Sequence, residues 1–192
     1  MAKTSGGVRG GNNSNGQSKV QKALQVHEAQ IRNNNYESAF VVNDNGETLL
    51  AKMGKQYKVE FSRGELKNMK DAILTHNHPR SLGAKGIRAI GNSFSREDIM
   101  LAVSANVKEI RAVTPTYTFS VKRPKGGWGA SYKTIGGDYE RANDAVFREM
   151  KSYLNKQNWS ESAIARAEVT HFNRVMEKLS KKYGWKYSHK KG

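Results

Sequence analysis

The chain has 192 residues, which is enough for one domain with extensions, and 36% of them are hydrophobic. Cysteine is absent, which excludes disulfide bonds and thiolate chemistry and leaves nitrogen and oxygen atoms as the ligands of any metal. The 33 lysines and arginines exceed the 17 acidic residues by 16, a net charge that favours a polyanionic partner or else serves solubility alone.

The N-terminal end predicts an unfolded extension followed by a helix. Residues 1–16 are mostly glycine, asparagine and serine with two cations, so we expect a disordered basic arm that buries too little apolar surface to offset its ordering entropy. They lack the apolar stretch of a secretory signal, and no run in the chain reaches the roughly 18 apolar residues of a membrane span. We therefore expect a soluble, cytoplasmic protein. Apolar residues then recur at three- and four-residue steps, which predicts a helix within 17–35.

The next segment predicts β-strands. The sequence NDNGE separates two apolar runs, and Asn-Gly readily adopts the positive φ angles of a hairpin turn, so we expect strands at 38–43 and 47–53. Alternating residues near 56–61 predict a third strand. The continuous apolar run DAILT, residues 71–75, predicts a buried central strand that ends at two histidines.

After a glycine-rich loop, the pattern predicts a helix and two more strands. Ser95, with Asp98 three residues later, has the form of a capping box, so we expect a helix to begin there. Alternating residues predict strands at 109–115 and 117–123. Turn residues at 122–129 are expected to close the sheet.

The last third of the chain predicts a pair of helices between residues 138 and 183, separated near 155–162. The predicted fold class is therefore α+β, a mixed β-sheet flanked by helices. We expect a core domain at 36–135, with the C-terminal helices of 136–192 packing on it.

The two histidines at the end of the central strand indicate a metal site. His76 and His78 share one face of a strand, about 6.6 to 7 Å apart along it, and their side chains can converge on one ion. Asp98, in the first turn of the next helix, would complete a His2Asp set with an open position for water, which is the layout of a catalytic zinc site. On spacing alone, Ser95 and Asp98 are also an ordinary helix cap, and His-x-His pairs also occur by chance.

The string HNHP…SFSRED resembles the signature of JAMM (MPN, Mov34) metalloproteases, in which His-x-His-Pro is followed by a spacer and then by Ser-x-x-Asp. The matching positions are His76, His78, Pro79, Ser95 and Asp98. The longer pattern from residue 36 to about 122 is similar to the C-terminal domain of Mu-type phage head-morphogenesis proteins and related prophage or toxin-like chains. The resemblance implies a JAMM or cytidine-deaminase-like core and a phage-associated protein in the cytoplasm of a bacterial or infected cell.

The resemblance also implies a reaction. A zinc ion on the three ligands would activate water for hydrolysis of a peptide or isopeptide bond in a protein substrate. Glu37, which matches the family's upstream glutamate, would act as general base and then as general acid, with Glu47 as a competing candidate. Ser95 would donate a hydrogen bond to the oxyanion of the tetrahedral intermediate.

The spacer between Pro79 and Ser95 departs from that pattern, because its fifteen residues make it longer than is usual in the family. This loop either folds away as an insertion or crosses the site, where its three glycines and three basic residues would form a mobile cover. In either case the spacing does not guarantee that Asp98 reaches the histidines.

A second class of function stays open. The adjacent letters H-N-H at 76–78 are not the motif of HNH nucleases, whose three residues are dispersed over a hairpin and a helix. The remaining alternative is a non-catalytic basic module that binds nucleic acid or capsid components, with weak, sequence-independent contacts to DNA or RNA. Aromatic residues near cations could stack on bases or fill the core: Trp128, Tyr132, Trp159 and Trp185.

Overall fold

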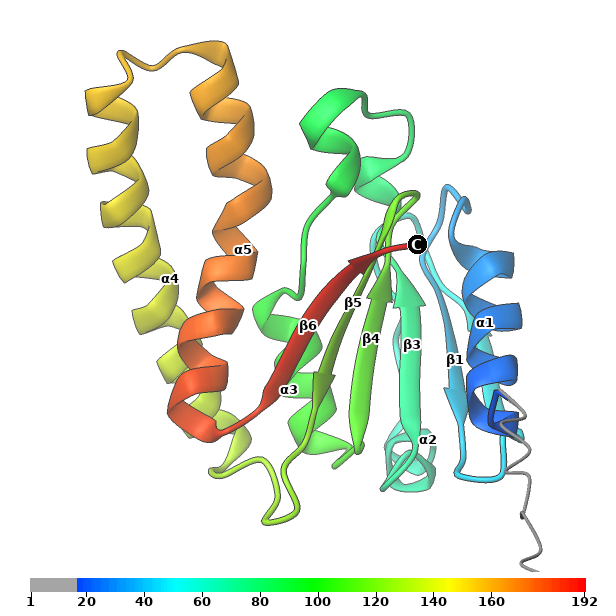
Figure 1. Ribbon diagram of the computed structural model, residues 1–192. Helices are drawn as coiled ribbons and strands as arrows, with labels where there is room; N and C mark the ends of the chain where they lie inside the picture. Colours follow the sequence, from blue (N-terminus) through cyan, green and yellow to red (C-terminus); the bar gives the residue numbers. More distant parts are fainter. Residues whose placement is uncertain (1–16) are drawn as a thin grey trace, which may run out of the picture.

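The computed structural model describes residues 17–192, which contain one six-stranded β-sheet (Figure 1). The strands are β1 (Ser38–Val42), β2 (Thr48–Met53), β3 (Ile73–Asn77), β4 (Glu109–Val113), β5 (Tyr117–Lys122) and β6 (Lys186–Lys191). Their order across the sheet is β2-β1-β3-β4-β5-β6. The pair β3 and β4 is parallel and the other neighbouring pairs are antiparallel, so the sheet is mixed. The predicted disordered arm at 1–16 lies outside the described residues.

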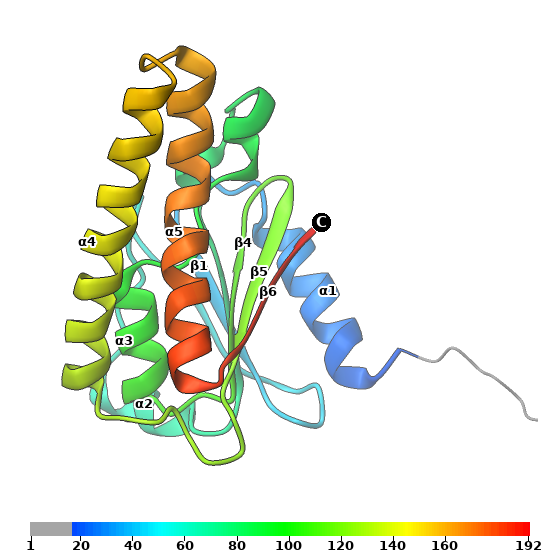
Figure 2. The same ribbon diagram turned by 60° about the vertical axis from the view of Figure 1, so that its left-hand side comes forward.

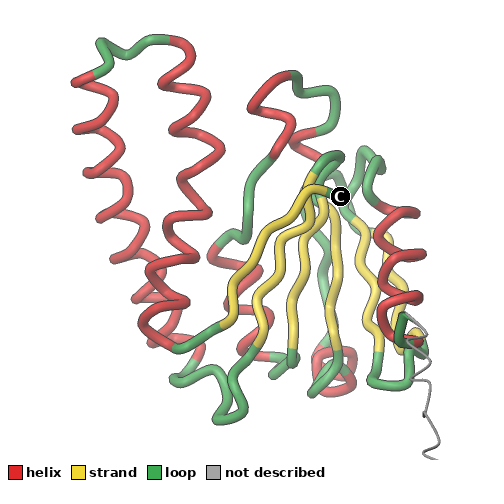
Figure 3. The backbone as a smooth tube through the Cα atoms, in the orientation of Figure 1, coloured by secondary structure: helices red, strands yellow, loops and turns green. Residues whose placement is uncertain are grey.

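Helices cover both faces of this sheet, which confirms the predicted α+β class. The helices are α1 (Lys19–Ile31), α2 (Arg63–Asn68), α3 (Arg96–Ser104), α4 (Tyr132–Lys156), α5 (Glu161–Tyr183) and the short 3-10 helices η1 (Pro79–Ser81) and η2 (Gly86–Ile90). Helix α1 packs on one face, against β1 and β3, while α3, α4 and α5 lie on the other (Figure 2). In Figure 3, α4 and α5 run side by side as an antiparallel hairpin next to β6.

Burial divides the interior into two apolar clusters, one on each face of the sheet. The larger lies under α3, α4 and α5, and among its fully buried side chains are Phe94, Ile99 and Phe119. Each such side chain contributes about 1.5 to 3 kcal/mol relative to an exposed position. The smaller cluster lies under α1 and consists of Leu24, Val42 and Ile73. No helix between residues 17 and 192 combines the length and the apolar content needed to cross a membrane.

A buried ion group attaches α1 to the sheet. Arg111 of β4 donates from Nε to Glu28 Oε1 of α1 (2.5 Å) and from Nη1 to Glu109 Oε1 (2.9 Å). Arg32, just beyond the helix, donates from Nη1 to the carbonyl oxygen of Tyr117 (2.9 Å). Because buried charges are stable only when paired, these contacts fix the helix on the sheet. They also fix the start of the short connection from α1 to β1.

The third strand predicted near residues 56–61 is wrong. After β2 the chain makes a tight turn with one isolated bridge between Lys55 and Lys58, and a Cβ on Gly54 would lie 2.2 Å from the carbonyl oxygen of Lys58. Ser62 then begins α2 through a capping box with Glu65. The segment at 56–61 has no neighbouring strand to pair with, so it stays irregular until the capping box at Ser62 starts α2.

The sheet is not closed by the turn residues at 122–129, because β6 adds antiparallel to the outer side of β5. The sequence did not predict this strand. Three of its six residues, KYSHKK, are lysines and all but Tyr187 are exposed, which is typical of a protected edge strand and leaves no apolar alternation to detect. Trp185, buried just before the strand, anchors it.

Helix α4 begins at Tyr132, earlier than the expected residue 138, because Ser131 caps it. Two glycines inside its first turns weaken the helical pattern. Gly136 permits the close approach of α3, since a Cβ there would lie 3.2 Å from side-chain atoms of both Arg96 and Met100.

Candidate metal site

Strand β3 places His76 and His78 at its carboxyl end. Side chains alternate along a strand, so His76 lies on the α3 side together with Leu74, whereas Asn77 lies on the α1 side. His78 follows the strand directly, and Pro79 begins η1. The chain therefore leaves the sheet at the point where the second imidazole turns toward the first.

The first turn of α3 supplies Asp98. Its N–H donates to Ser95 Oγ (3.1 Å), and the N–H of Ser95 donates to Asp98 Oδ2 (2.8 Å). The predicted capping box is thus present. The Ser95 hydroxyl also donates to Oδ2 (2.9 Å), so one carboxylate oxygen is held by the cap while Oδ1 is directed at His76.

The long spacer between Pro79 and Ser95 is an insertion tied to α5. Arg88 of η2 forms ion pairs of 2.8 Å with both Glu161 and Glu168. Figure 1 shows the insertion standing beyond the end of the sheet, beside α5. Although the spacer is long, Asp98 reaches both histidines.

Gly91 lets the insertion return to the sheet. Its φ is +72°, and a Cβ there would lie 2.6 Å from Thr114 Cγ2 and 2.8 Å from Ser81 Oγ. Only glycine fits such a position, because it combines positive φ with close contact. The Thr114 hydroxyl also donates to the carbonyl oxygen of Ile90 (2.8 Å), which fastens the returning chain just before the site.

The three side chains converge at hydrogen-bonding distances. His76 Nε2 lies 2.9 Å from His78 Nε2 and 3.2 Å from Asp98 Oδ1, and His78 Nε2 lies 3.5 Å from Asp98 Oδ2. Neighbouring ligand atoms around a tetrahedral metal with bonds of 2.0 to 2.1 Å are about 3.3 Å apart. Two imidazole nitrogens this close repel each other unless a proton or a metal cation lies between them. The donor set and its spacing therefore fit a bound metal ion.

A hydrogen bond outside the cluster sets the tautomer of His78. Its Nδ1 lies 2.9 Å from the carbonyl oxygen of Asn92, which can only accept, so Nδ1 carries the proton. The lone pair is then on Nε2, the atom that faces the other ligands, as expected for a metal-binding imidazole. His76 Nδ1 has no hydrogen-bond partner among the described residues.

Glu37, the residue just before β1, joins the three residues. Alternation places it on the same face as Ala39, which pairs with His76. Its carboxylate and the ligand atoms of the other three residues all lie within 4.8 Å of one another. Burial raises the pKa of Glu37, and the neighbouring imidazoles, when protonated, offset only part of that rise. The competing Glu47 accepts instead from Asn43 in the β1–β2 turn (2.6 Å).

The cluster also changes the titration of its own members. Burial alone would raise the pKa of Asp98, but the charges of His76 and His78 and their hydrogen bonds hold it well below its usual range. Burial alone would lower the pKa of His78, but the hydrogen bond to Asp98 and its negative charge raise it above the ordinary value. The carboxylate is therefore ionised at neutral pH and available as a ligand, while protons compete with a metal at His78.

Residues that sequence reasoning missed support the site from distant elements. Tyr139 of α4 donates to the carbonyl oxygen of Phe94 (2.9 Å), and Tyr187 of β6 donates to Ser93 Oγ (2.8 Å). Both tyrosines hold the segment that joins Asn92 to the α3 cap. Local sequence patterns cannot predict these contacts, because the partners of the two hydrogen bonds are 45 and 94 residues apart along the chain. Asn77, between the two histidines, has no local sequence signal that indicates a role.

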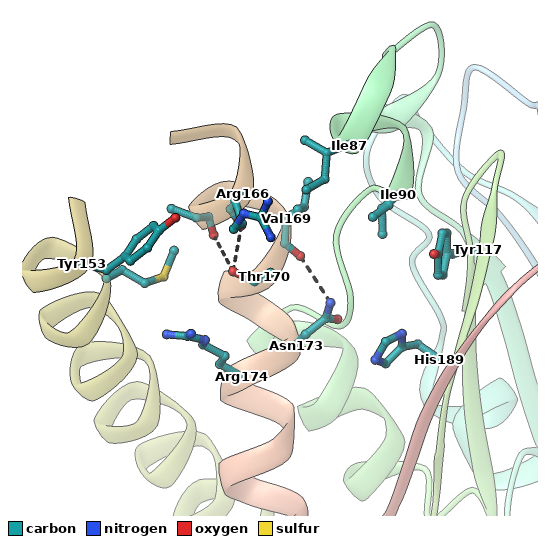
Figure 4. Close-up of a pocket in the computed structure, with 12 residues that line it drawn as sticks. Ile87, Ile90, Tyr117, Tyr153, Arg166, Val169, Thr170, Asn173, Arg174 and His189 are labelled. Carbon is teal, nitrogen blue, oxygen red and sulfur yellow. Dashed lines mark hydrogen bonds between the residues drawn. The ribbon is translucent and has the colours of Figure 1, made fainter. Parts of the chain in front are cut away.

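A cavity of about 370 Å³ lies apart from this cluster, between α5, α4, η2 and the β5–β6 edge (Figure 4). Ile87 and Ile90 form part of its wall, and Tyr117 and His189 lie across from α5. Two arginines of α5, Arg166 and Arg174, also line it. None of the four clustered residues belongs to this cavity, so any ligand there would bind separately from a metal.

Comparisons of the chain with protein-family models, with curated proteins and with solved structures find no match. The chemistry open to the cluster therefore follows from its own geometry and from the residue pattern around it.

Proposed function

We propose that this protein is a zinc-dependent hydrolase of peptide or isopeptide bonds. The observation that carries the proposal is the convergence of two imidazole Nε2 atoms and one carboxylate, with a second carboxylate, Glu37, beside them. The resemblance of HNHP…SFSRED to the JAMM signature supports the same roles for His76, His78 and Asp98. On that resemblance the protein acts in the cytoplasm of a bacterial or phage-infected cell.

The ligand set suits zinc. It has nitrogen and oxygen donors only, and three protein ligands leave a fourth tetrahedral position open, as in catalytic zinc sites. When bound, zinc supplies Lewis acidity, which promotes ionisation of water and polarises a carbonyl group.

The protein's own residues supply the proton transfers and the orientation. Glu37, with its raised pKa, accepts a proton from the attacking water and returns it to the leaving amine. The Asn92 carbonyl holds His78 with its Nε2 lone pair toward the site. Ser95 donates its hydroxyl hydrogen to Asp98, so its first role is to orient that ligand. To stabilise an oxyanion, as the resemblance implies, the hydroxyl would have to rotate away from Asp98.

The test combines metal content with two matched variants. Protein purified without a histidine tag should contain, or take up on reconstitution, about one zinc per chain. His78→Ala should lose the zinc. Glu37→Gln preserves size and hydrogen-bonding capacity, so it should keep the zinc while hydrolysis of a fluorogenic peptide or isopeptide substrate falls by roughly 10²-fold or more.

Each part of this experiment can contradict the proposal. Wild-type protein that refuses zinc would exclude the metalloenzyme. Activity that survives Glu37→Gln but disappears in Glu47→Gln would show that the base was wrongly assigned.

A second candidate function is polyanion binding by the cavity of Figure 4. Arg166 and Arg174 carry positive charge at its lining, and Tyr117 offers an aromatic face on which a base could stack. The net charge of +16 favours the same class of partner, single-stranded DNA or RNA. Binding of a labelled oligonucleotide that does not depend on zinc or on His76 would support this function.

A further inference from the structure

Asn77, the residue between the two histidines, is fully buried and makes three hydrogen bonds with one carboxamide. Its Oδ1 accepts from the N–H of Ser38 (2.7 Å). Its Nδ2 donates to the carbonyl oxygens of Asn34 (3.2 Å) and Tyr36 (3.0 Å). Asn34 and Tyr36 belong to the connection between α1 and β1, and Ser38 is the first residue of β1. One side chain on β3 therefore holds the segment that contains Glu37.

These bonds enclose Glu37 from both sides along the chain. The carbonyl of Tyr36 precedes it and the N–H of Ser38 follows it, and Asn77 binds both. The backbone pairing of β1 with β3 ends at Ala39 and His76, so the Asn77 carboxamide takes the place of the next pairing. From the opposite direction, the N–H of Glu37 donates to the Lys55 carbonyl (3.0 Å) and the Gly54 N–H donates to the Glu37 carbonyl (2.7 Å).

We propose that Asn77 is a positioning residue that fixes the general base against the metal ligands. This inference rests on the proposed function and assigns a further residue to it. The Asn77 side chain bonds to residues 34–38 on the α1 side of β3, whereas its neighbours in sequence, His76 and His78, belong to the candidate metal site. The end of β3 thus positions the histidines on one face, and on the other face its Asn77 holds the segment that contains the base. Proton transfer is sensitive to displacements of about 1 Å, so loss of this link should impair the base before it impairs metal binding.

The test uses Asn77→Ala with Thr75→Val as the matched control. Thr75 is also fully buried on the α1 side of β3, next to His76, but its hydroxyl bonds to Glu28 and not to residues 34–38. Asn77→Ala should keep about one zinc per chain, while the amides of residues 34–38 exchange hydrogen faster than in wild type. Thr75→Val should leave that exchange unchanged.

The kinetic prediction is specific to positioning. On the fluorogenic substrate, Asn77→Ala should lower kcat by roughly 10- to 100-fold with little change in KM, as is typical for partners that orient catalytic groups. Added to Glu37→Gln, it should lower the rate no further, because the base it positions is already gone. If Asn77→Ala does not fold, Asn77→Thr, which keeps strand propensity and one hydroxyl, takes its place in the same measurements.

Three results would overturn the inference: loss of zinc from the Asn77 variant, unchanged exchange at 34–38, or an equal rate loss in the wild-type and Glu37→Gln backgrounds. The first would make Asn77 a support of the ligand strand alone. Failure of the proposed function would give a different result. Full activity in Glu37→Gln would show that Glu37 is not the general base, whereas faster amide exchange at 34–38 in Asn77→Ala would still show that Asn77 holds this segment.

Discussion

Ser95 illustrates how one side chain can satisfy a structural rule and a chemical one together. Its oxygen caps α3 by accepting from the Asp98 N–H, and its hydrogen goes to the Asp98 carboxylate. The helix needs the first contact and a metal site needs the second, because an oriented ligand binds metal more tightly. The two interpretations of the Ser95–Asp98 motif, as a helix cap and as part of a metal site, are therefore compatible.

Replacing Ser95 should separate the two contributions. Ser95→Ala should lower the free energy of unfolding by about 1 kcal/mol through loss of the cap, and should weaken zinc binding by roughly 10- to 100-fold because Asp98 loses its orienting donor. Ser62→Ala is the matched control, since Ser62 forms the same kind of capping box with Glu65 on α2. Urea unfolding and a competitive zinc titration measure the two quantities. Equal zinc affinity in the two variants would mean that Ser95 is only a cap.

At the residue scale, the sequence predicted the members of the site better than their supports. The spacing of His76, His78 and Asp98 follows from one strand end and one helix start, and both are local signals. Sequence context favoured Glu37 over Glu47 only weakly, because the β1–β3 register is needed to place Glu37 on the face of His76. The supports depend on contacts between distant segments, which no local pattern contains.

Among the elements, one buried carboxylate links α4 to α5. Asp138 of α4 accepts from Lys182 Nζ (2.5 Å) and from the hydroxyl of Tyr183, both on α5, and from Arg141. The hydrogen bond from Lys182, followed by that from Tyr183, holds the pKa of Asp138 well below its usual value. Burial, with the bond to Asp138, raises the pKa of Tyr183 to about 12, so its hydroxyl stays a donor at neutral pH.

Asp138→Asn should destabilise the protein by about 1 to 2 kcal/mol at pH 7, a figure reduced because Lys182 and Arg141 are largely exposed. The folded pKa of Asp138 lies below its unfolded value of about 4. Its contribution is therefore complete above that value and is lost as the pH falls through the folded pKa. The stability difference between wild type and variant should be constant from pH 5 to 8 and shrink below pH 4.

Glu149 provides the comparison, because its pair with Lys178 (2.8 Å) also joins α4 to α5 but is about half exposed on both sides. Glu149→Gln should cost only a few tenths of a kcal/mol. Urea unfolding across the pH range measures both variants. A constant Asp138→Asn difference down to pH 3 would contradict the linkage.

The elements themselves were predictable where a local signal and a tertiary partner agree. The β1–β2 hairpin, the buried β3 strand and the capped α3 helix have both. The segment 56–61 has alternation but no neighbouring strand, and β6 has a neighbouring strand but no alternation. Secondary structure in these two places depends on whether a neighbouring strand is available for pairing, and local sequence patterns do not show this.

On the scale of the whole molecule, the predicted class of fold is confirmed. The predicted aromatic candidates divide, with Trp128 and Trp185 buried in the core and Tyr132 and Trp159 exposed. Stacking on bases is thus closed to the first pair. The cavity of Figure 4 instead places Arg166 and Arg174 near other aromatic side chains, on the hairpin and not at the metal cluster.

If this cavity binds single-stranded nucleic acid, loss of its two arginines should change the salt dependence of binding. Each phosphate contact contributes roughly 0.7 to the slope of log K against log salt, so Arg166→Ala with Arg174→Ala should reduce the slope by about 1.4. The control pair, Arg63→Ala with Lys67→Ala on α2, removes the same charge from exposed positions outside the cavity lining. Fluorescence anisotropy of a labelled oligonucleotide over a salt series measures both pairs.

Equal slopes in the two double variants would mean that the oligonucleotide responds to the total charge of the protein and does not bind specifically in the cavity. His76→Ala should bind the oligonucleotide like wild type and leave it intact, because the cavity shares no residue with the metal cluster. Cleavage of the oligonucleotide by zinc-loaded wild type but not by His76→Ala would place a nuclease reaction at the cluster and overturn the peptidase assignment. Salt-sensitive binding without cleavage, the same in both proteins, would leave the two sites independent, one for a protein substrate and one for a polyanion.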